Sequence, residues 1–163
     1  MNNPDGLLRE LLIHKNYCYM LRSQRKRQIR NVGLLLLRVG LGIMFILHGY
    51  PKVFGGPEMW SEVGSSLQSI GIDSAPMFFG FMAGIAEFFG GAFILFGLFF
   101  KPSLIILMIV MLTASATHIA AGDPFSIYSH SIELAIVFFS LLFIGPGNYN
   151  LGKKLEKRRR RRY

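Results

Sequence analysis

Four long apolar stretches constrain this chain more than any other feature of its sequence. They cover roughly residues 32–50, 77–100, 103–121 and 127–146. A bilayer core of about 30 Å needs about 20 mostly apolar residues in each spanning helix. With 52% hydrophobic residues and a mean hydropathy of +0.40, the chain is also too apolar for a soluble domain of its length. We therefore predict an all-α integral membrane protein, a four-helix bundle that spans the lipid bilayer.

The first apolar stretch is predicted to be a retained helix and not a cleaved signal peptide. Its basic lead-in is unusually long, its apolar run continues into Tyr50-Pro51, and no small-x-small cleavage site follows. Cys18 is the only cysteine, which excludes an intrachain disulfide and a two-thiol relay. Any redox chemistry would therefore borrow its electron carriers from outside the chain.

Positive charge is concentrated beside the predicted spans. Of the 18 Lys and Arg residues, seven precede the first span, eight follow the last, and Lys101 lies between the second and third. In a four-span arrangement all of these fall on one side, which is the positive-inside pattern and predicts both termini in the cytoplasm. This pattern already accounts for the net charge of +9, so we do not expect nucleic acid as a partner.

The predicted bundle occupies residues 32–147, between two basic cytoplasmic segments. Residues 1–31 are expected to be solvated or to lie on the lipid surface, where anionic headgroups attract basic side chains. Residues 148–163 form the basic tail. A natural start at Met20 in place of Met1 would leave a shorter basic lead, and the sequence leaves both starts open.

A short amphipathic helix is expected between the first and second spans, on the outer membrane face. Pro57 suits a first helical position, and Gly71 can end the helix. Four apolar residues recur at helical spacing on one side: Trp60, Val63, Leu67 and Ile70.

Two ionisable residues lie deep within the predicted spans. Arg38 is about 15 Å from the outer end of the first span at His48, and Glu87 is about 15 Å from the start of the second at Met77. Charges at mid-bilayer cost about 2.5–3.5 kcal/mol on insertion scales, so each should face the interior and have a partner. We predict that Arg38 and Glu87 form a buried ion pair that fixes helix register. A role in proton movement or in holding a polar ligand is the alternative.

Three helix faces are predicted to be interior because small or polar residues recur on them at helical spacing. They are Gly80, Gly84, Glu87 and Gly91 on the second span, Met111, Ser115 and His118 on the third, and Glu133, Ile136 and Ser140 on the fourth.

The other polar residues of the spans are expected to line a cup that opens outward: His48, Tyr50, Lys52, His118 and Glu133. Histidine and carboxylate groups can exchange hydrogen bonds and protons with a quinone headgroup or another polar-tipped lipid. Structural histidines at a wet helix end are the alternative. The candidate ligands come singly from three helices without a His/Glu spacing motif, so we predict no metal and no intrinsic cofactor.

Three segments of the chain resemble the DoxX family of small bacterial four-helix membrane proteins. They are LLRVGLGIMFILHGYPKVFGG, GIAEFFGGAFILFGLFFKPS and ELAIVFFSLLFIGPGNYNL, and together the resemblance covers roughly residues 32–152. The family pattern favours Arg38, His48-Gly49-x-x-Lys52, Glu87 and Gly145-Pro146-Gly147, all of which are present here. The long basic N-terminal segment and the arginine-rich tail depart from the pattern and leave the partner open.

The resemblance implies a multi-pass protein of the bacterial cytoplasmic (inner) membrane. Relatives include the membrane subunit of a thiosulfate:quinone oxidoreductase and a mycobacterial member credited with gathering soluble redox enzymes, and most members have no assigned reaction. We expect a redox-associated membrane module that binds a quinone or recruits a soluble oxidoreductase or another membrane subunit, and that is not an enzyme by itself. The alternatives are a ligand-free anchor or assembly protein and a small-solute transporter, which would need to form a homo-oligomer.

Overall fold

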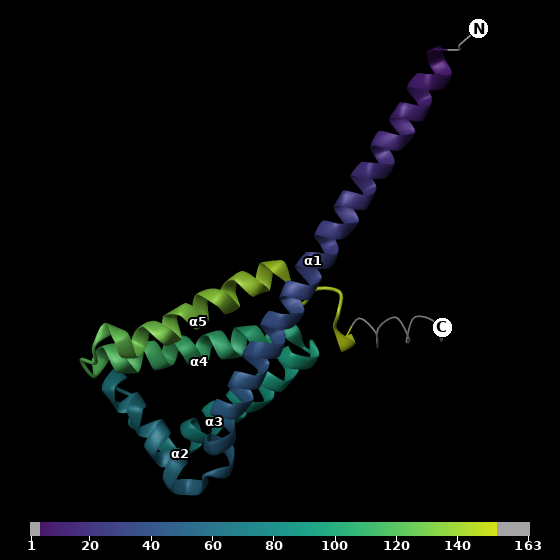
Figure 1. The fold of residues 1–163 in the computed structure, drawn as a ribbon. Coiled ribbons are helices and arrows are strands. Elements are labelled where there is room, and N and C mark those ends of the chain that lie inside the picture. Colours follow the sequence, from purple (N-terminus) through teal and green to yellow (C-terminus); the bar gives the residue numbers. More distant parts are fainter. Residues whose placement is uncertain (1–3, 153–163) are drawn as a thin grey trace.

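The structure, a computed structural model, describes residues 4–152 of the chain. Within this range every regular element is helical (Figure 1). The elements are α1 (Pro4–Phe54), α2 (Gly56–Ser65), the short 3-10 helix η1 (Ser66–Ile70), α3 (Pro76–Phe96), α4 (Phe100–Ala120) and α5 (Phe125–Ile144). Most of the predicted basic tail, from residue 153 onward, lies outside the described residues.

Four of these helices are long and apolar enough to cross a membrane. They are the part of α1 from His14 to Phe54, and the whole of α3, α4 and α5. The prediction of an all-α chain with four spans is therefore confirmed. The predicted second span ended at residue 100, whereas α3 ends at Phe96, because Gly97 takes the left-handed conformation (φ 68°) that terminates helices.

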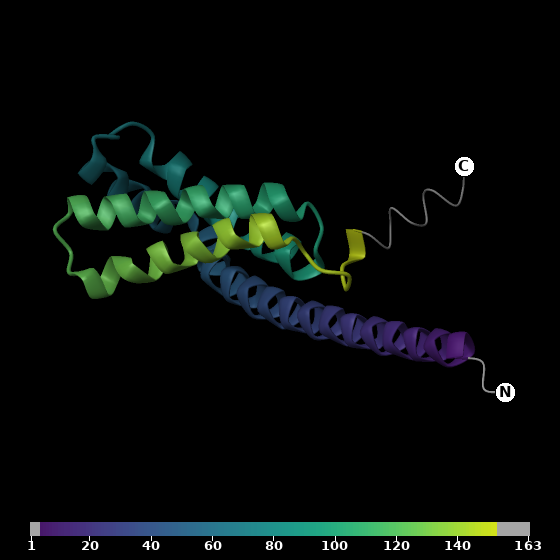
Figure 2. The same ribbon diagram turned by 90° about the horizontal axis from the view of Figure 1, so that it is seen from above.

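The first helix is much longer than its predicted span. Residues 4–31, predicted as a separate basic segment, continue the same helix, and α1 is 51 residues long. Its N-terminal part projects away from the other helices (Figures 1 and 2). At its other end the helix does not stop at Tyr50-Pro51 as predicted but continues to Phe54. Proline removes one backbone donor and its ring crowds the carbonyl four residues earlier, and the helix ends three residues after Pro51.

The helices form two pairs that meet at one end of the molecule and separate at the other (Figure 1). One pair is α1 with α3, and the other is α4 with α5. We call the end where the α3–α4 turn and the residues after α5 lie the basic end. At the opposite end, which we call the α2 end, α2 packs on α3 and η1 reaches α4.

The predicted stripe of small residues on α3 is confirmed as interior, and it packs against α1 and α2. Gly80, Gly84, Glu87 and Gly91 are all buried. A Cβ atom at Gly91 would lie 2.8 Å from the Cβ of Phe45, and the backbones can approach only because it is absent. The ring of Phe45 also lies 5.2 Å from that of Phe138, and this contact joins α1 to α5.

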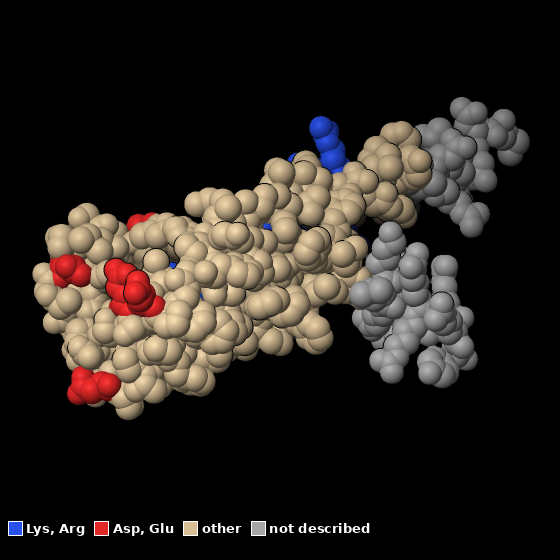
Figure 3. All heavy atoms as spheres, turned by 90° about the horizontal axis from the view of Figure 1, so that it is seen from below, with Lys and Arg blue, Asp and Glu red and all other residues tan. Residues whose placement is uncertain are grey.

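Charged side chains are separated along the length of the bundle. Figure 3 shows Asp and Glu side chains gathered toward one end of the surface. At the α2 end these are Glu58, Glu62, Asp73 and Asp123, whereas the basic end carries Lys101 and the projecting part of α1 carries Lys15, Arg22, Arg25, Lys26, Arg27 and Arg30. The asymmetry that the sequence predicted is therefore present in three dimensions.

Candidate functional site

A buried ion pair joins the last turn of α1 to the middle of α3. Lys52 Nζ lies 2.6 Å from Oε1 and 2.7 Å from Oε2 of Glu87. The Glu87 side chain is 3% exposed and that of Lys52 is 28% exposed. The prediction that Glu87 is interior is confirmed. The prediction that its partner is Arg38 is wrong, because the partner is Lys52.

The register between α1 and α3 explains this correction. Arg38 donates a hydrogen bond to the carbonyl of Leu95, so it lies level with the last turn of α3. Leu95 is two helical turns beyond Glu87, or about 12 Å along the helix. The prediction placed the outer end of α1 level with the start of α3. In the structure the start of α3 at Pro76 packs on Gly64 of α2, and Lys52 in the last turn of α1 lies beside Gly84 and Glu87 further along α3.

Arg38 is held by backbone carbonyls at the basic end. Its guanidinium donates to the carbonyls of Pro146 (2.6 Å) and Tyr149 (2.8 Å), in addition to that of Leu95 (3.3 Å). The residue is only 2% exposed. The C-terminal end of a helix carries a partial negative charge, and Arg38 lies at this end of α3 and just beyond that of α5. The arginine in the apolar stretch therefore fastens the chain after α5 to α1 and α3.

Trp60 fixes α2 beside the ion pair. Its indole Nε1 donates to the carbonyl oxygen of Lys52 at 2.7 Å, and its ring lies 4.6 Å from that of Phe81 on α3. The expected amphipathic helix is present, although its second half is the 3-10 helix η1. Gly71 ends it in the left-handed conformation (φ 83°), as predicted.

A cavity of about 620 Å³ lies beside the ion pair, between α2–η1, α3 and α4. This volume is within the range of small-molecule sites. Most of the lining is apolar, and the polar side chains that line it are Lys52, Ser66, Glu87, Thr113 and Thr117. Several apolar lining residues are also exposed on the flanks of α3 and α4, among them Phe79, Met82, Ile106 and Ile109. The cavity therefore opens sideways, toward the lipid that surrounds these helices.

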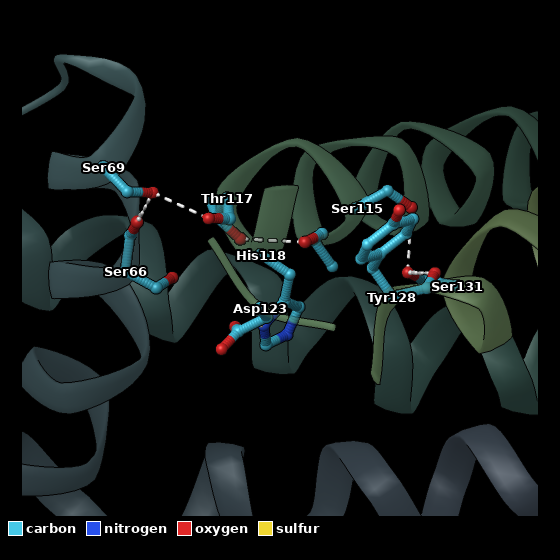
Figure 4. A network of polar contacts seen from close by, with 9 residues as sticks. Ser66, Ser69, Ser115, Thr117, His118, Asp123, Tyr128 and Ser131 are labelled. Carbon is cyan, nitrogen blue, oxygen red and sulfur yellow. Dashed lines mark hydrogen bonds and ion pairs between the residues drawn. The ribbon is translucent and has the colours of Figure 1, made fainter. Parts of the chain in front are cut away.

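Hydroxyl groups attach η1 to α4 at the α2 end of this cavity. Ser69 Oγ donates to the carbonyl of Ser66 at 2.8 Å and lies 3.0 Å from the carbonyl of Thr117 (Figure 4). Ser66 and Thr117 both line the cavity. The segment α2–η1 therefore covers the cavity and is held at both ends, by Trp60 and by Ser69.

His118 has a partner that the sequence analysis missed. Its Nδ1 lies 2.7 Å from Oδ2 of Asp123, in the turn before α5 (Figure 4). The pair could have been predicted from the sequence, because Asp123 follows His118 by five residues in a Gly-Asp-Pro turn at the end of α4. Nearby, Ser115 Oγ and Ser131 Oγ lie 2.8 Å apart and link α4 to α5. Ser115 is buried, as predicted for its face, and His118 is half-buried.

The predicted five-residue cup is not assembled. Of its members only Lys52 lines the cavity, and His48, Tyr50 and Glu133 are exposed. On α1 the interior positions are Phe45, Gly49 and Lys52, and His48 and Tyr50 fall on either side of this stripe.

The predicted interior face of α5 is likewise exposed. The helix buries Ser131, Ala135, Phe138 and Leu141. Because successive residues turn by about 100°, a position two residues from a buried one lies on the far side of the helix. Glu133, Ile136 and Ser140 therefore point away from the bundle.

The side chains in the described part of the chain offer no cluster of three or more His, Cys, Asp or Glu residues that could hold a metal ion. The chemistry of the site is therefore that of one ammonium, one carboxylate and a few hydroxyl groups around an apolar space. Such a set can bind an amphipathic molecule with a hydrogen-bonding headgroup and an apolar tail.

Comparisons with known proteins agree with the resemblance seen in the sequence. The family model DoxX matches residues 33–120, which is more than half of the chain. The chain is 26% identical over 135 residues to Inner membrane protein YqjF of Escherichia coli (strain K12), and the alignment covers 81% of this chain and 98% of that protein. No solved structure shows a significant match. The family match includes Arg38, Lys52, Glu87 and all of the residues that line the cavity.

Proposed function

The chain belongs to the DoxX family and is a multi-pass inner-membrane protein, and on this premise we propose that it is a redox-associated module that binds a quinone beside Lys52 and Glu87. One observation carries the proposal. A buried ion pair forms part of the wall of an apolar cavity that opens toward lipid. Ion pairs inside membrane proteins usually mark sites of ligand or proton handling.

The two charged groups suit the two redox forms of a quinone. The Lys52 ammonium can donate a hydrogen bond to a quinone carbonyl, and the Glu87 carboxylate can accept one from a quinol hydroxyl. A headgroup placed in the cavity beside the ion pair would find both a donor and an acceptor. The isoprenoid tail would leave the cavity between α3 and α4, along Met82 and Ile109.

We propose that the basic end faces the cytoplasm, so that the cavity lies toward the outer side of the membrane. The support is the charge distribution of the described residues, with the basic side chains of α1 and Lys101 at one end and acidic side chains at the other. Both termini would then be cytoplasmic, as the sequence predicts.

Electrons for the quinone would come from a soluble oxidoreductase or another membrane subunit. The single cysteine, Cys18, cannot form a dithiol relay within one chain. We therefore propose a binding module within a redox assembly and no catalytic activity of the chain by itself.

A quinone-binding assay on the purified protein tests this proposal. In nanodiscs, a short-tailed benzoquinone should raise the midpoint temperature of unfolding. At a ligand concentration of 100 Kd the expected stabilisation is about 2.7 kcal/mol. Thr113→Phe, which fills the cavity, should abolish the shift. The control Leu112→Phe alters an exposed α4 residue outside the cavity lining and should keep it. No shift in the wild-type protein at any quinone concentration, or an equal shift in both variants, refutes the proposal.

The projecting part of α1 supports a second candidate function, that of an anchor for soluble proteins. This part presents Lys15, Arg22, Arg25, Lys26, Arg27 and Arg30 on one continuous helix beyond the bundle (Figure 2). Deletion of residues 1–27 should then release copurifying proteins, and Thr113→Phe should not. Loss of the copurifying proteins in Thr113→Phe, and their retention after the deletion, would instead favour the cavity as the functional centre.

A further inference from the structure

Thr113 differs from the other hydroxyl-bearing residues of α4. The hydroxyls of Ser103, Ser115 and Thr117 each donate to a carbonyl three or four residues earlier, at 2.9 Å in every case. Serine and threonine in helices commonly bond back to the helix in this way. Thr113 lines the cavity, and no group in the described part of the chain hydrogen-bonds to its hydroxyl. This hydroxyl is therefore available to a molecule in the cavity.

The other two hydroxyl side chains of the cavity lining already have acceptors. Ser66 donates to the carbonyl of Val63 at 2.8 Å, and Thr117 donates to that of Ala114. Each can still accept a hydrogen bond, but a ligand carbonyl offers no proton. Among the described residues that line the cavity, Thr113 thus has the one hydroxyl that is free to donate to a carbonyl of a ligand.

Thr113 lies at about the same depth as Lys52, on a different wall of the cavity. A Cβ atom at Gly90 would lie 3.0 Å from Cγ of Leu107, so these two residues are level where α3 packs on α4. The helices are antiparallel, so six residues back along α3 and six forward along α4 bring Gly84 level with Thr113. A Cβ atom at Gly84 would in turn lie 2.9 Å from that of Lys52.

The charges of the cavity favour a neutral headgroup. Lys52 and Glu87 neutralise each other, and no other charged side chain of the described residues lines the cavity. A fatty acid would bring its carboxylate toward that of Glu87, and an amine would bring its charge toward the ammonium of Lys52. Two of the three ammonium protons bond Glu87, which leaves the third for a ligand. Lys52 and Thr113 can therefore each donate to a neutral acceptor.

We propose that Thr113 binds the second carbonyl of a ring whose first carbonyl is bound by Lys52. A ring with carbonyl groups at opposite positions, as in a 1,4-quinone, uses both donors, whereas a lipid with one polar end leaves Thr113 without a bond. Thr113 is then the residue that selects ring headgroups with two acceptors over lipids with one. This inference rests on the proposed quinone site and adds the determinant of its specificity.

The affinity of Thr113→Val for a quinone tests the role of the hydroxyl. Valine has nearly the shape of threonine but cannot donate. In nanodiscs, the Kd for a short-tailed 1,4-benzoquinone should therefore rise by about 2- to 12-fold, the range for one neutral hydrogen bond. Thr113→Ser keeps the hydroxyl and should stay near the wild-type value. The dependence of the unfolding midpoint on ligand concentration gives each Kd. An unchanged Kd in Thr113→Val overturns the proposal.

A ligand with one carbonyl provides the matched control. A cyclohexenone with the same ring substituents and tail should bind wild-type protein and Thr113→Val equally, because the charged donor Lys52 takes its single carbonyl. An equal loss of affinity for both ligands overturns the proposal, since valine would then disturb the whole cavity. Without ligand, Thr113→Val should unfold at the same detergent concentration as the wild type. A marked destabilisation would place the hydroxyl in a bond within the protein and would also overturn the proposal.

The outcomes separate this inference from the proposed function. If wild-type protein binds the quinone and Thr113→Val binds it equally well, the quinone site stands and the role of Thr113 is refuted. If the wild-type protein binds no quinone, both are refuted together.

Discussion

Replacement of Lys52 by methionine is expected to destabilise the protein more than replacement of Glu87 by leucine. The two side chains form one ion pair, but their surroundings differ, with 3% of Glu87 and 28% of Lys52 exposed. In Lys52→Met the carboxylate stays buried without a partner, and the loss of one member of a buried pair costs about 3–5 kcal/mol. In Glu87→Leu the flexible lysine can turn its ammonium toward water or headgroups. The cost of that change should be about 1–2 kcal/mol lower, because a partly exposed charge loses less solvation.

The double variant Lys52→Met/Glu87→Leu should recover most of the stability lost in Lys52→Met, since it leaves no unpaired charge. Unfolding of all four proteins by a denaturing detergent in mixed micelles supplies the double-mutant cycle. A coupling free energy near zero would refute the reasoning, because the residues would then not interact in the membrane. A larger loss in Glu87→Leu than in Lys52→Met would refute the asymmetry.

Three further changes test other contacts. Arg38→Lys should increase amide hydrogen exchange between residues 145 and 150, because an ammonium cannot reproduce the fork that binds three carbonyls; unchanged exchange contradicts this role. Gly91→Leu should cost at least about 1–3 kcal/mol by overpacking against Phe45, whereas Gly33→Leu, where nothing lies within 4 Å, should be tolerated in the same detergent titration. His118→Ala should cost less than about 1 kcal/mol, since the pair with Asp123 is 44% and 35% exposed, and a larger loss would point to a buried role.

The fold could be predicted from the sequence because lipid imposes strong rules on length and polarity. Four apolar stretches gave four spanning helices, and the spacing of Gly80, Gly84, Glu87 and Gly91 identified the face of α3 that packs inward. These inferences depend only on the number of residues per turn and on the thickness of a membrane.

The partners of the charged residues could not be predicted, because they depend on the axial register of α1 against α3. Lys52 lies 14 residues, or about 21 Å along α1, from Arg38, and the register of the two helices places Lys52 and not Arg38 level with Glu87. Sequence periodicity also cannot distinguish a polar stripe that faces the interior from one that faces away from the bundle. For that reason the Glu133 face of α5 was assigned to the wrong side.

The continuous first helix connects the projecting basic segment to the ion pair. Arg38 fixes it to the carbonyls of Pro146 and Tyr149, at a point about 51 Å from Pro4 and about 21 Å from Lys52 by the rise per residue. Between Arg38 and Lys52 the helix packs so closely on α3 that a Cβ atom at Gly49 would lie 2.8 Å from the Cα of Phe88. A partner bound to the projecting segment would therefore be joined to the wall of the cavity by one rigid helix.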